Sequence, residues 1–274
     1  MLSREAPLFH QSAEFFQRRW ELTAQALRAD LDFHDQDSSY SSHNFHAFPA
    51  KFPPQLPRLF IEHLTRPGDV VLDPMQGSGT TTLEAALNGR KALGFDIDPL
   101  SLLITKVKTT PLDPVSVLTT SKEILRRAAA LYDQRSKALI EDREHRWDPQ
   151  TRKFIEYWFD VDTQFALLAL LREIEAMADP GTRNFFYLAF SAIIITKSGG
   201  VSLALDLAHT RPHRAKLIYS PNGEIIEGQQ EFDAPSSNLR YATKILRSPL
   251  SEFAKRVENN VKGLLKEEHP GSQP

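Results

Sequence analysis

The sequence has 274 residues, with 41% hydrophobic and 25% charged residues, a formal net charge of −2 and no cysteine. This composition predicts a globular chain with one large or two small domains, and it excludes disulfides and thiolate metal sites. The near-neutral charge gives no whole-chain argument for nucleic-acid binding. The N-terminal residues carry early charge without an apolar core, and no run of about 18 apolar residues is present, so we expect a cytoplasmic chain with no membrane contact.

The first part of the chain, residues 1–42, is predicted to be a helix followed by a loop. Aromatic and aliphatic residues recur at imperfect helical spacing between residues 11 and 30, and a polar run rich in Ser, Asp and Asn follows. Prolines punctuate residues 49–57, and Leu59, Phe60 and Leu64 then have helical spacing. A second helix is therefore expected to end near Thr65, before Pro67-Gly68.

Residues 69–98 contain the strongest pattern in the sequence. The apolar run Val70–Leu72 ends in Asp73, and a glycine-rich turn then leads into Thr81–Ala86, which has helix-forming composition. The next apolar run, Ala92–Phe95, ends in Asp96, roughly 20 residues after the turn. This order predicts a strand, a turn, a helix and a second strand of a βαβ unit, which is the setting of a nucleotide-type site.

Each part of this pattern has a physical role in binding a ligand. Gly77 and Gly79 have no Cβ, so the backbone can adopt positive φ and a ligand can approach main-chain N–H groups at the positive end of a helix. Asp96 is placed to accept hydrogen bonds from ribose hydroxyls. Asp73 offers a carboxylate to an amino or cationic group. The two acids favour a ligand with a ribose, an amino group and a positive centre.

Three classes of ligand bind at turns of this kind. A phosphate-binding P-loop requires Lys and then Ser or Thr after its last glycine, whereas Thr80 and Thr81 follow Gly79. A dinucleotide fingerprint requires a third glycine where Thr82 stands. S-adenosyl-L-methionine (SAM) remains as the ligand that fits. The alternative is a tight strand-to-helix turn without a ligand.

The segment DPMQGSGTT, beginning at Asp73, resembles the DPFxGSGTT signature of amino-group DNA methyltransferases, which methylate the exocyclic amine of adenine or cytosine. The preceding residues from His46, HAFPAKFPPQLPRLFIEHLTRPGDVVLDP, are similar to the segment that precedes this signature in the family. The segment GFDIDPLS, beginning at Gly94, is similar to the ribose-binding acid and the turn after it. The close resemblance covers residues 43–101.

The resemblance implies an α/β fold, with a partial Rossmann-like sheet of a SAM-dependent methyltransferase in residues 43–112 and a large helical insertion. It also implies DNA as a partner and a role in methylation of the kind found in restriction-modification. Lys51 and Phe52 are expected near the methionine end and the adenine of the cofactor. The full set of expected cofactor-binding residues is Pro49, Ala50, Lys51, Phe52, Asp73, Pro74, Gly77, Ser78, Gly79, Thr80, Asp96 and Ile97.

Residues 113–200 are predicted to form the helical insertion. A helix is expected before it, at Leu100–Lys108. Within it, longer helices are expected at residues 115–140, 150–177 and 182–196, the last being nearly all apolar and therefore buried. Ser198-Gly199-Gly200 is predicted to break this block. It is a candidate target-recognition region, and a scaffold or dimer surface is an equally open interpretation.

Residues 201–248 are predicted to contain a hairpin and a basic segment. Two apolar runs flank Pro221-Asn222-Gly223, which is a hairpin signal. Tyr219-Ser220-Pro221-Asn222 superficially resembles the family's catalytic motif, but the second proline and the aromatic residue are missing. The basic residues form two groups, which we interpret as solvated surface or as nucleic-acid contacts: Arg211, His213, Arg214 and Lys216, and Arg240, Lys244 and Arg247.

Residues 249–274 are expected to be an amphipathic helix and a tail.

The sequence contains no Pro-Pro-Tyr motif, and we assign no catalytic residue and no metal ligand. The first hypothesis is that a second polypeptide carries the catalytic strand and completes the sheet. The alternatives are an inactive or truncated remnant, a non-catalytic regulatory subunit, and an RNA guanine methyltransferase, whose DPM and GSGT residues are similar.

Overall fold

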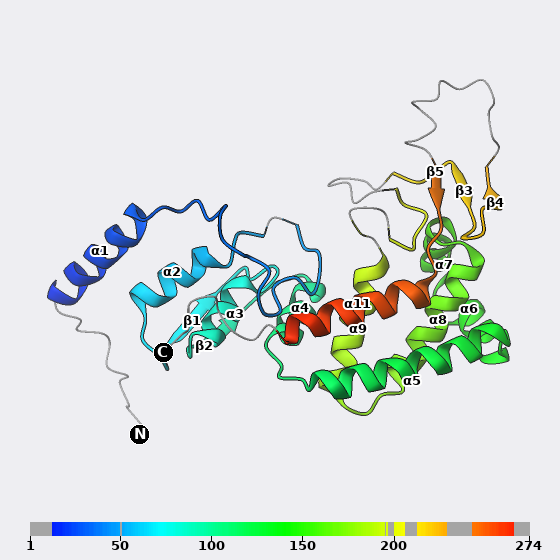
Figure 1. Ribbon diagram of the computed structural model, residues 1–274, viewed down its shortest axis with the longest axis horizontal. Helices are drawn as coiled ribbons and strands as arrows, with labels where there is room; N and C mark the ends of the chain where they lie inside the picture. Colours follow the sequence, from blue (N-terminus) through cyan, green and yellow to red (C-terminus); the bar gives the residue numbers. More distant parts are fainter. Residues whose placement is uncertain are drawn as a thin grey trace, which may run out of the picture. The chain divides into compact units, whose positions relative to one another are not determined.

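The computed structural model describes residues 13–49, 51–194, 196, 200–205, 213–228 and 243–265. They form a mixed α/β structure with small sheets and many helices (Figure 1). The chain divides into two compact units. Unit 1 comprises Met1–Ser38 and Phe48–Thr109, and unit 2 comprises Ser39–Ala47 and Thr110–Pro274.

Unit 1 contains a βαβ element that the sequence predicts. Strand β1 (Val70–Asp73) is followed by helix α3 (Thr80–Leu87) and strand β2 (Lys91–Gly94). The strands are parallel, with Val70 opposite Lys91 and Asp73 opposite Gly94. The predicted strand, turn, helix and second strand are thus confirmed. Asp73 is the last residue of β1, and Asp96 follows the end of the adjacent parallel strand β2.

Three further helices belong to unit 1. Helix α3 packs against both strands, α2 packs against α3, and α1 packs against α2 (Figure 1). Helix α4 begins at the residue after Asp98, whose side chain caps it by accepting a hydrogen bond from Leu100 N at 2.9 Å. Proline at the first helical position fits this start. The bounds are α1, Ala13–Arg28; α2, Gln55–Leu64; and α4, Pro99–Lys108.

The described residues leave one face of the β1–β2 sheet uncovered. Side chains alternate along both strands, and one face carries exposed Lys91 together with four large apolar side chains that are more than half exposed: Val70 (56%), Leu72 (59%), Leu93 (54%) and Phe95 (61%). Parallel sheets are normally covered on both faces, because their crossover connections bring helices to each side. This face is therefore an unusual surface for a solvated parallel sheet.

The outer edge of β1 is also open. The carbonyl groups of Asp69 and Asp73 accept hydrogen bonds from Lys91 N (2.8 Å) and Phe95 N (2.9 Å). Backbone groups alternate between the two edges of a strand, so those of Val70 and Leu72 point toward the other edge. Within the described ranges, no strand pairs with that edge.

Unit 2 is built mainly from helices. The core is formed where α5, α8, α9 and α11 contact one another. An aromatic cluster fills it: Phe45, Phe185, Phe186 and Phe253 are fully buried, with neighbouring ring centroids 5.5–6.0 Å apart. The bounds are α5, Pro114–Asp133; α6, Lys137–His145; α7, Pro149–Trp158; α8, Val161–Glu175; α9, Pro180–Ile194; and α11, Pro249–Leu264.

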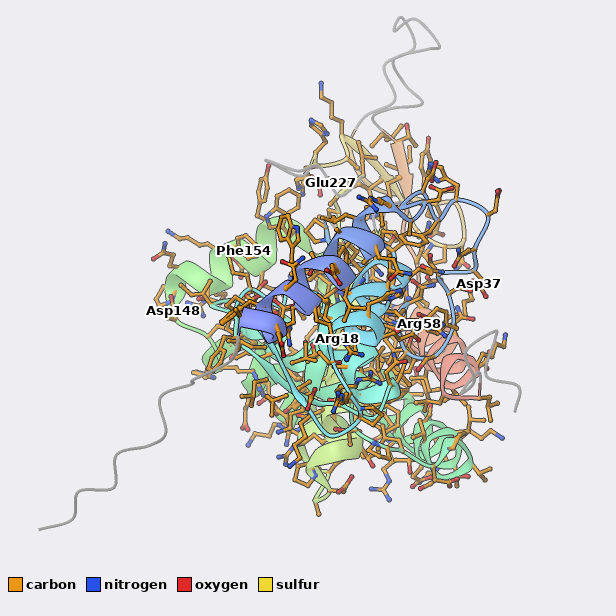
Figure 2. The ribbon with its side chains drawn as sticks, turned by 90° about the vertical axis from the view of Figure 1, so that its left-hand side faces the viewer. Arg18, Asp37, Arg58, Asp148, Phe154 and Glu227 are labelled. Carbon is orange, nitrogen blue, oxygen red and sulfur yellow. The ribbon has the colours of Figure 1, made fainter. Side chains whose placement is uncertain are left out.

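Two helices predicted as continuous are each interrupted, which corrects the predictions for residues 115–140 and 150–177. The first stops at Asp133, Arg135 takes φ of 45°, and Ser136 caps α6. The second is broken at Phe159, and Asp160 caps α8 by accepting from Asp162 N at 2.9 Å. In both cases a capping side chain competes with continuation of the helix. The start of α7 follows the same rule, with Asp148 as its cap (Figure 2).

The hairpin prediction is confirmed. Strands β3 (Leu217–Tyr219) and β4 (Ile225–Glu227) are antiparallel, and Gly223 takes φ of 86° between them. Ser220 Oγ accepts from Asn222 N at 3.2 Å and from Glu224 N at 3.0 Å, so this serine belongs to the turn. Strand β5 (Thr243–Ile245), which the sequence analysis did not predict, pairs parallel with β3.

The basic residues of this segment are largely engaged within unit 2. Arg214 forms a paired contact with Glu227 at 2.6 and 2.8 Å, and Lys244 is buried and donates to the carbonyl groups of Ser202 and Ala204. Arg211, Arg240, Ser198 and Gly199 lie outside the described residues.

No helix in the described part is long and apolar enough to cross a bilayer. The same residues contain no cluster of metal-binding side chains.

Candidate functional site

The glycine turn between β1 and α3 is held in a specific backbone conformation. Gly77 and Gly79 take φ of 50° and 70°, a region that residues with a Cβ rarely adopt. Gly79 N donates to Gln76 O at 2.7 Å, and Gly79 O accepts from Leu83 N at 3.0 Å, which starts the helix. The turn therefore ends directly in the N-terminus of α3, where N–H groups and the helix dipole favour an electron-rich ligand group.

The side chain of Asp96, which follows β2, hydrogen-bonds to the glycine turn, which follows β1. Its Oδ2 accepts from Gly77 N at 2.8 Å, and its Oδ1 accepts from Asp98 N at 2.9 Å. These two backbone donors, with Asp98 N first and Gly77 N second, lower the pKa of the Asp96 carboxyl below its usual value. A carboxylate has about four acceptor positions, so Asp96 retains capacity for hydroxyl donors from a ligand.

Asp73 lies at the same edge of the sheet as Asp96. It ends β1 opposite Gly94, and its Oδ1 accepts from Met75 N at 3.2 Å. Beyond the paired residues, Gln76 N donates to Phe95 O at 3.0 Å and continues the link between the two strand ends. The structure thus brings the turn, Asp73 and Asp96 together, with Pro74 and Ile97 exposed beside them.

Ser78 and Thr80 are buried in the turn. Their hydroxyl groups lie 2.9 Å apart and hydrogen-bond to each other. Their side chains therefore stabilise the start of α3, and any contact with a ligand would be made by their backbone.

The segment before α2 reaches the turn through Phe48, a residue missed by the sequence analysis. A Cβ built on Gly77 would lie 3.4 Å from Cε1 of the Phe48 ring, so this ring packs directly against the turn. Pro49, Lys51 and Phe52 follow it and are exposed, whereas Ala50 lies outside the described residues. The sequence signal for it is its place as the first phenylalanine after His46 in HAFPAKF, directly before residues expected to bind the cofactor.

Helix α4 supports the turn from another side, and this too was missed. Ser101 Oγ donates to Gly77 O at 2.6 Å, and Lys108 Nζ donates to Ser78 O at 2.7 Å. The spacing of these polar residues on one helix face was the only sequence signal. Burial, and secondarily the charge of Lys51, lowers the pKa of Lys108 to about 7.

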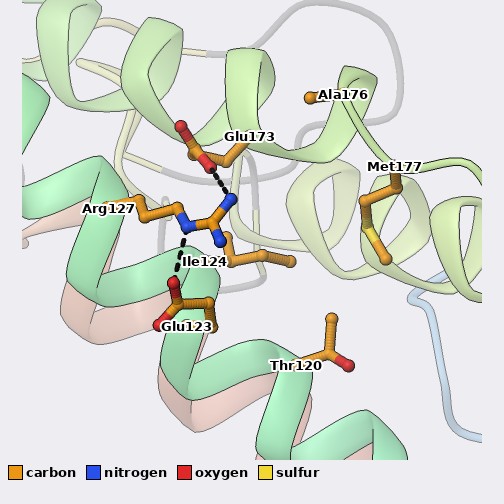
Figure 3. Close-up of a pocket in the computed structure, with 7 residues that line it drawn as sticks. All are labelled: Thr120, Glu123, Ile124, Arg127, Glu173, Ala176 and Met177. Atoms are coloured by element: carbon orange, nitrogen blue, oxygen red, sulfur yellow. Dashed lines mark hydrogen bonds and ion pairs between the residues drawn. The ribbon is translucent and has the colours of Figure 1, made fainter.

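A separate open pocket of about 210 Å³ lies in unit 2 (Figure 3). Arg127 sits in it, with its Nε 2.6 Å from Glu123 Oε1 and an Nη 3.9 Å from Glu173 Oε2. Both acids lie within reach of this one guanidinium, so we assign no ligand to the pocket. The lining residues are Thr120, Glu123, Ile124, Arg127, Glu173, Ala176 and Met177.

Comparison with known families bears on the segment that contains this turn. Residues 10–106 match the family model described as DNA methylase (N6_N4_Mtase). This segment is therefore similar to amino-group DNA methyltransferases. The match contains β1, the glycine turn, β2 and most of α4, so the DNA methyltransferase segment and the candidate site coincide.

Individual relatives are named as Type II methyltransferases. The chain is 27% identical over 200 residues to the Type II methyltransferase M.MvaI of Kocuria varians, covering 70% of this chain and 42% of that protein. It is 32% identical over 98 residues to M.MjaII of Methanocaldococcus jannaschii, covering 36% of this chain and 17% of that methyltransferase. It is 47% identical over 53 residues to M.PvuII of Proteus hauseri, covering 19% and 16%.

These matches set the extent of the likeness. The 200-residue match is too long to lie in unit 1 alone, so it includes part of the helical unit. The chain spans less than half the length of these methyltransferase relatives. No solved structure matches the chain.

Proposed function

We propose that this chain is the SAM-binding part of a site-specific DNA methyltransferase that transfers a methyl group to an exocyclic amine of adenine or cytosine. The observation that carries the proposal is the link between Asp96 and Gly77, at 2.8 Å. It fixes an ionised acid beside a glycine turn and a helix N-terminus, at the carboxyl ends of two parallel strands. Ligands of open α/β sheets bind at this edge.

The residues present fit SAM. Asp96 has acceptor capacity for the two ribose hydroxyls, and the Asp73 carboxylate is placed for the amino group or the positive centre. Ile97 and Met75 are 99% and 83% exposed next to these acids and offer apolar surface for the adenine. SAM would supply an activated methyl group on its sulfonium. The chain's residues would bind and orient it.

The proposed set of binding residues follows the sequence prediction. Gly77, Ser78, Gly79 and Thr80 would contribute backbone, and Asp73 and Asp96 would contribute carboxylates. The segment that follows Phe48 would approach from the side of the turn on which that ring packs. The remaining proposed contacts are Pro49, Ala50, Lys51, Phe52, Pro74 and Ile97.

DNA is the proposed substrate because both the family description and the names of the relatives refer to DNA methylation or to Type II methyltransferases. An RNA guanine methyltransferase has no comparable support. Unit 2 is the proposed place of target recognition, since the longest relative match extends into it.

A second polypeptide is proposed to supply the catalytic motif. Methylation of an amine requires acceptors that hold the nitrogen and an aromatic face against the extruded base. Among the described strands, none carries the Pro-Pro-Tyr motif, and Ser220-Pro221 is part of a hairpin turn. The exposed apolar face and the unpaired edge of the β1–β2 sheet support this proposal. A two-stranded parallel sheet is too small to be stable alone, so we expect a second polypeptide to extend or cover it.

The direct test is transfer of labelled methyl from SAM to DNA, measured for the chain alone and after co-expression with the product of the adjacent gene. We expect no transfer by the chain alone and transfer to DNA, but not to tRNA, by the pair. Methylation of DNA by the purified single chain would remove the need for a partner. Absence of SAM binding both alone and with the partner would favour an inactive remnant or a regulatory subunit.

A further inference from the structure

Helix α4 contacts the glycine turn with a stripe of three residues. Ser101, Thr105 and Lys108 are separated by four and three positions and therefore lie on one face of the helix. They meet three consecutive turn residues, Gly77, Gly79 and Ser78 respectively. Each contact has a different character, so α4 acts as a fitted support for the turn.

Thr105 is the steric part of this support. A Cβ built on Gly79 would lie 2.2 Å from Thr105 Oγ1 and 2.9 Å from Thr105 Cβ. The Thr105 hydroxyl is buried and has no hydrogen-bond partner in the described structure. Its contribution is therefore shape: it fits the turn closely only while position 79 is glycine.

Ser101 and Lys108 fix the orientation of two peptide groups. A trans peptide is planar, with its C=O and N–H pointing in opposite directions. The bond from Ser101 to Gly77 O therefore directs Ser78 N–H away from α4. The bond from Lys108 to Ser78 O likewise directs Gly79 N–H away, toward Gln76 O at 2.7 Å.

Lys108 is an unexpected residue for this position. Its side chain is only 6% exposed, although burial of an ammonium group is unfavourable. A protonated amine makes a stronger hydrogen bond to a carbonyl than a neutral one does. Lys51, in the segment before α2, is a charged group that acts on it, and the effect of Lys51 and burial both favour the neutral amine.

We propose that Lys108 is a positioning residue for the cofactor: by holding Ser78 O, it fixes the Ser78–Gly79 peptide and so sets the affinity of the turn for SAM. This inference rests on the proposed function of the turn. Lys108 is not proposed to touch SAM, and its proposed effect on the cofactor passes through the backbone of Ser78 and Gly79.

The test compares Lys108→Met with Lys106→Met, a change of an exposed lysine on the same helix. Binding of SAM is measured by calorimetry on the chain, together with its co-expressed partner if SAM binding requires it. We expect about tenfold weaker binding for Lys108→Met at pH 6.5, without a lower urea midpoint, and no change for Lys106→Met. A merely structural lysine would lower the midpoint and leave the affinity of the folded protein unchanged, and that result would overturn the proposal.

A second measurement does not depend on SAM. The amide ¹⁵N signal of Gly79 reports on the hydrogen bond accepted by the preceding carbonyl, Ser78 O, to which Lys108 donates. We expect this signal to move in Lys108→Met and to keep its wild-type position in Lys106→Met. An unchanged Gly79 signal in Lys108→Met would overturn the proposal, whereas a moved signal without any SAM binding by the wild type would refute the proposed function alone.

Discussion

Asp96 is the single side chain on which the proposed cofactor site depends most directly. Replacing it with Ala removes the acceptor of the Gly77 and Asp98 N–H groups and of the proposed ribose hydroxyls. We expect Asp96→Ala to weaken SAM binding at least about tenfold, because hydrogen bonds to a charged acceptor are lost. Asp96→Asn, which keeps one acceptor oxygen, should have an intermediate effect in the same calorimetric titration. Equal affinities for the wild type and Asp96→Ala would remove this residue from the site.

Lys108 predicts a specific dependence of stability on pH. Its pKa in the folded state is about 7, below the ordinary 10.5, so between these values the unfolded chain binds more protons. Stability should therefore rise with pH across this window, by at most about 1.4 kcal/mol per pH unit from this group. In urea unfolding at pH 7 to 10, Lys108→Met should lack this rise, while Lys106→Met should retain it. A wild type and a Lys108→Met variant with parallel pH profiles would contradict the assigned pKa.

The glycine turn is an element whose conformation and packing can be tested separately. Gly79 and Gly68 both have positive φ, but a Cβ on Gly79 would collide with Thr105 whereas one on Gly68 meets nothing within 4 Å. Gly68→Ala should therefore lower the free energy of unfolding only by the backbone term, about 1–2 kcal/mol. Gly79→Ala should lower it further and reduce SAM binding, and Gly79→Val should be worse. Equal losses for the two Ala variants, measured by urea unfolding, would show that Thr105 yields without effect.

Local patterns predicted the elements of unit 1 well. The apolar runs that precede Asp73 and Asp96 form the two parallel strands β1 and β2. They were predictable because local composition and the placement of glycine indicate a βαβ unit. The continuous helices expected at residues 115–140 and 150–177 were wrong, because periodicity is not altered by a cap such as Ser136 or Asp160. Strand β5 was missed because three residues carry too little periodicity, and its pairing with β3 is non-local.

The candidate site was predictable only where a motif names its residues. Asp73, Gly77, Gly79 and Asp96 stand in a recognisable order, and the structure brings them to one edge. Phe48, Ser101 and Lys108 were not predictable in the same way. Their roles depend on which surfaces of the turn are packed, and a sequence pattern does not specify that.

The uncovered sheet face is the feature of the whole molecule that bears on a partner. Leu93→Asp and Leu72→Asp place charges on side chains that are already exposed, so stability of the chain should change by no more than about 0.5 kcal/mol. We expect both variants to lose association with the proposed second polypeptide and the methyl transfer that depends on it. Val115→Asp, on an exposed residue of α5, is the matched control. Wild-type methyl transfer by the Leu93→Asp variant together with the second polypeptide would show that nothing docks on this face.

The central claim is that the turn between two acid-tipped parallel strands binds SAM. The most direct measurement is a titration of the ¹⁵N-labelled chain with SAM up to millimolar concentration, which detects even weak binding. The account predicts that the amide signals that move belong to residues 51–52, 73–80 and 95–98. Signals that move only in the helices of unit 2, or none at all with the partner present, would contradict it.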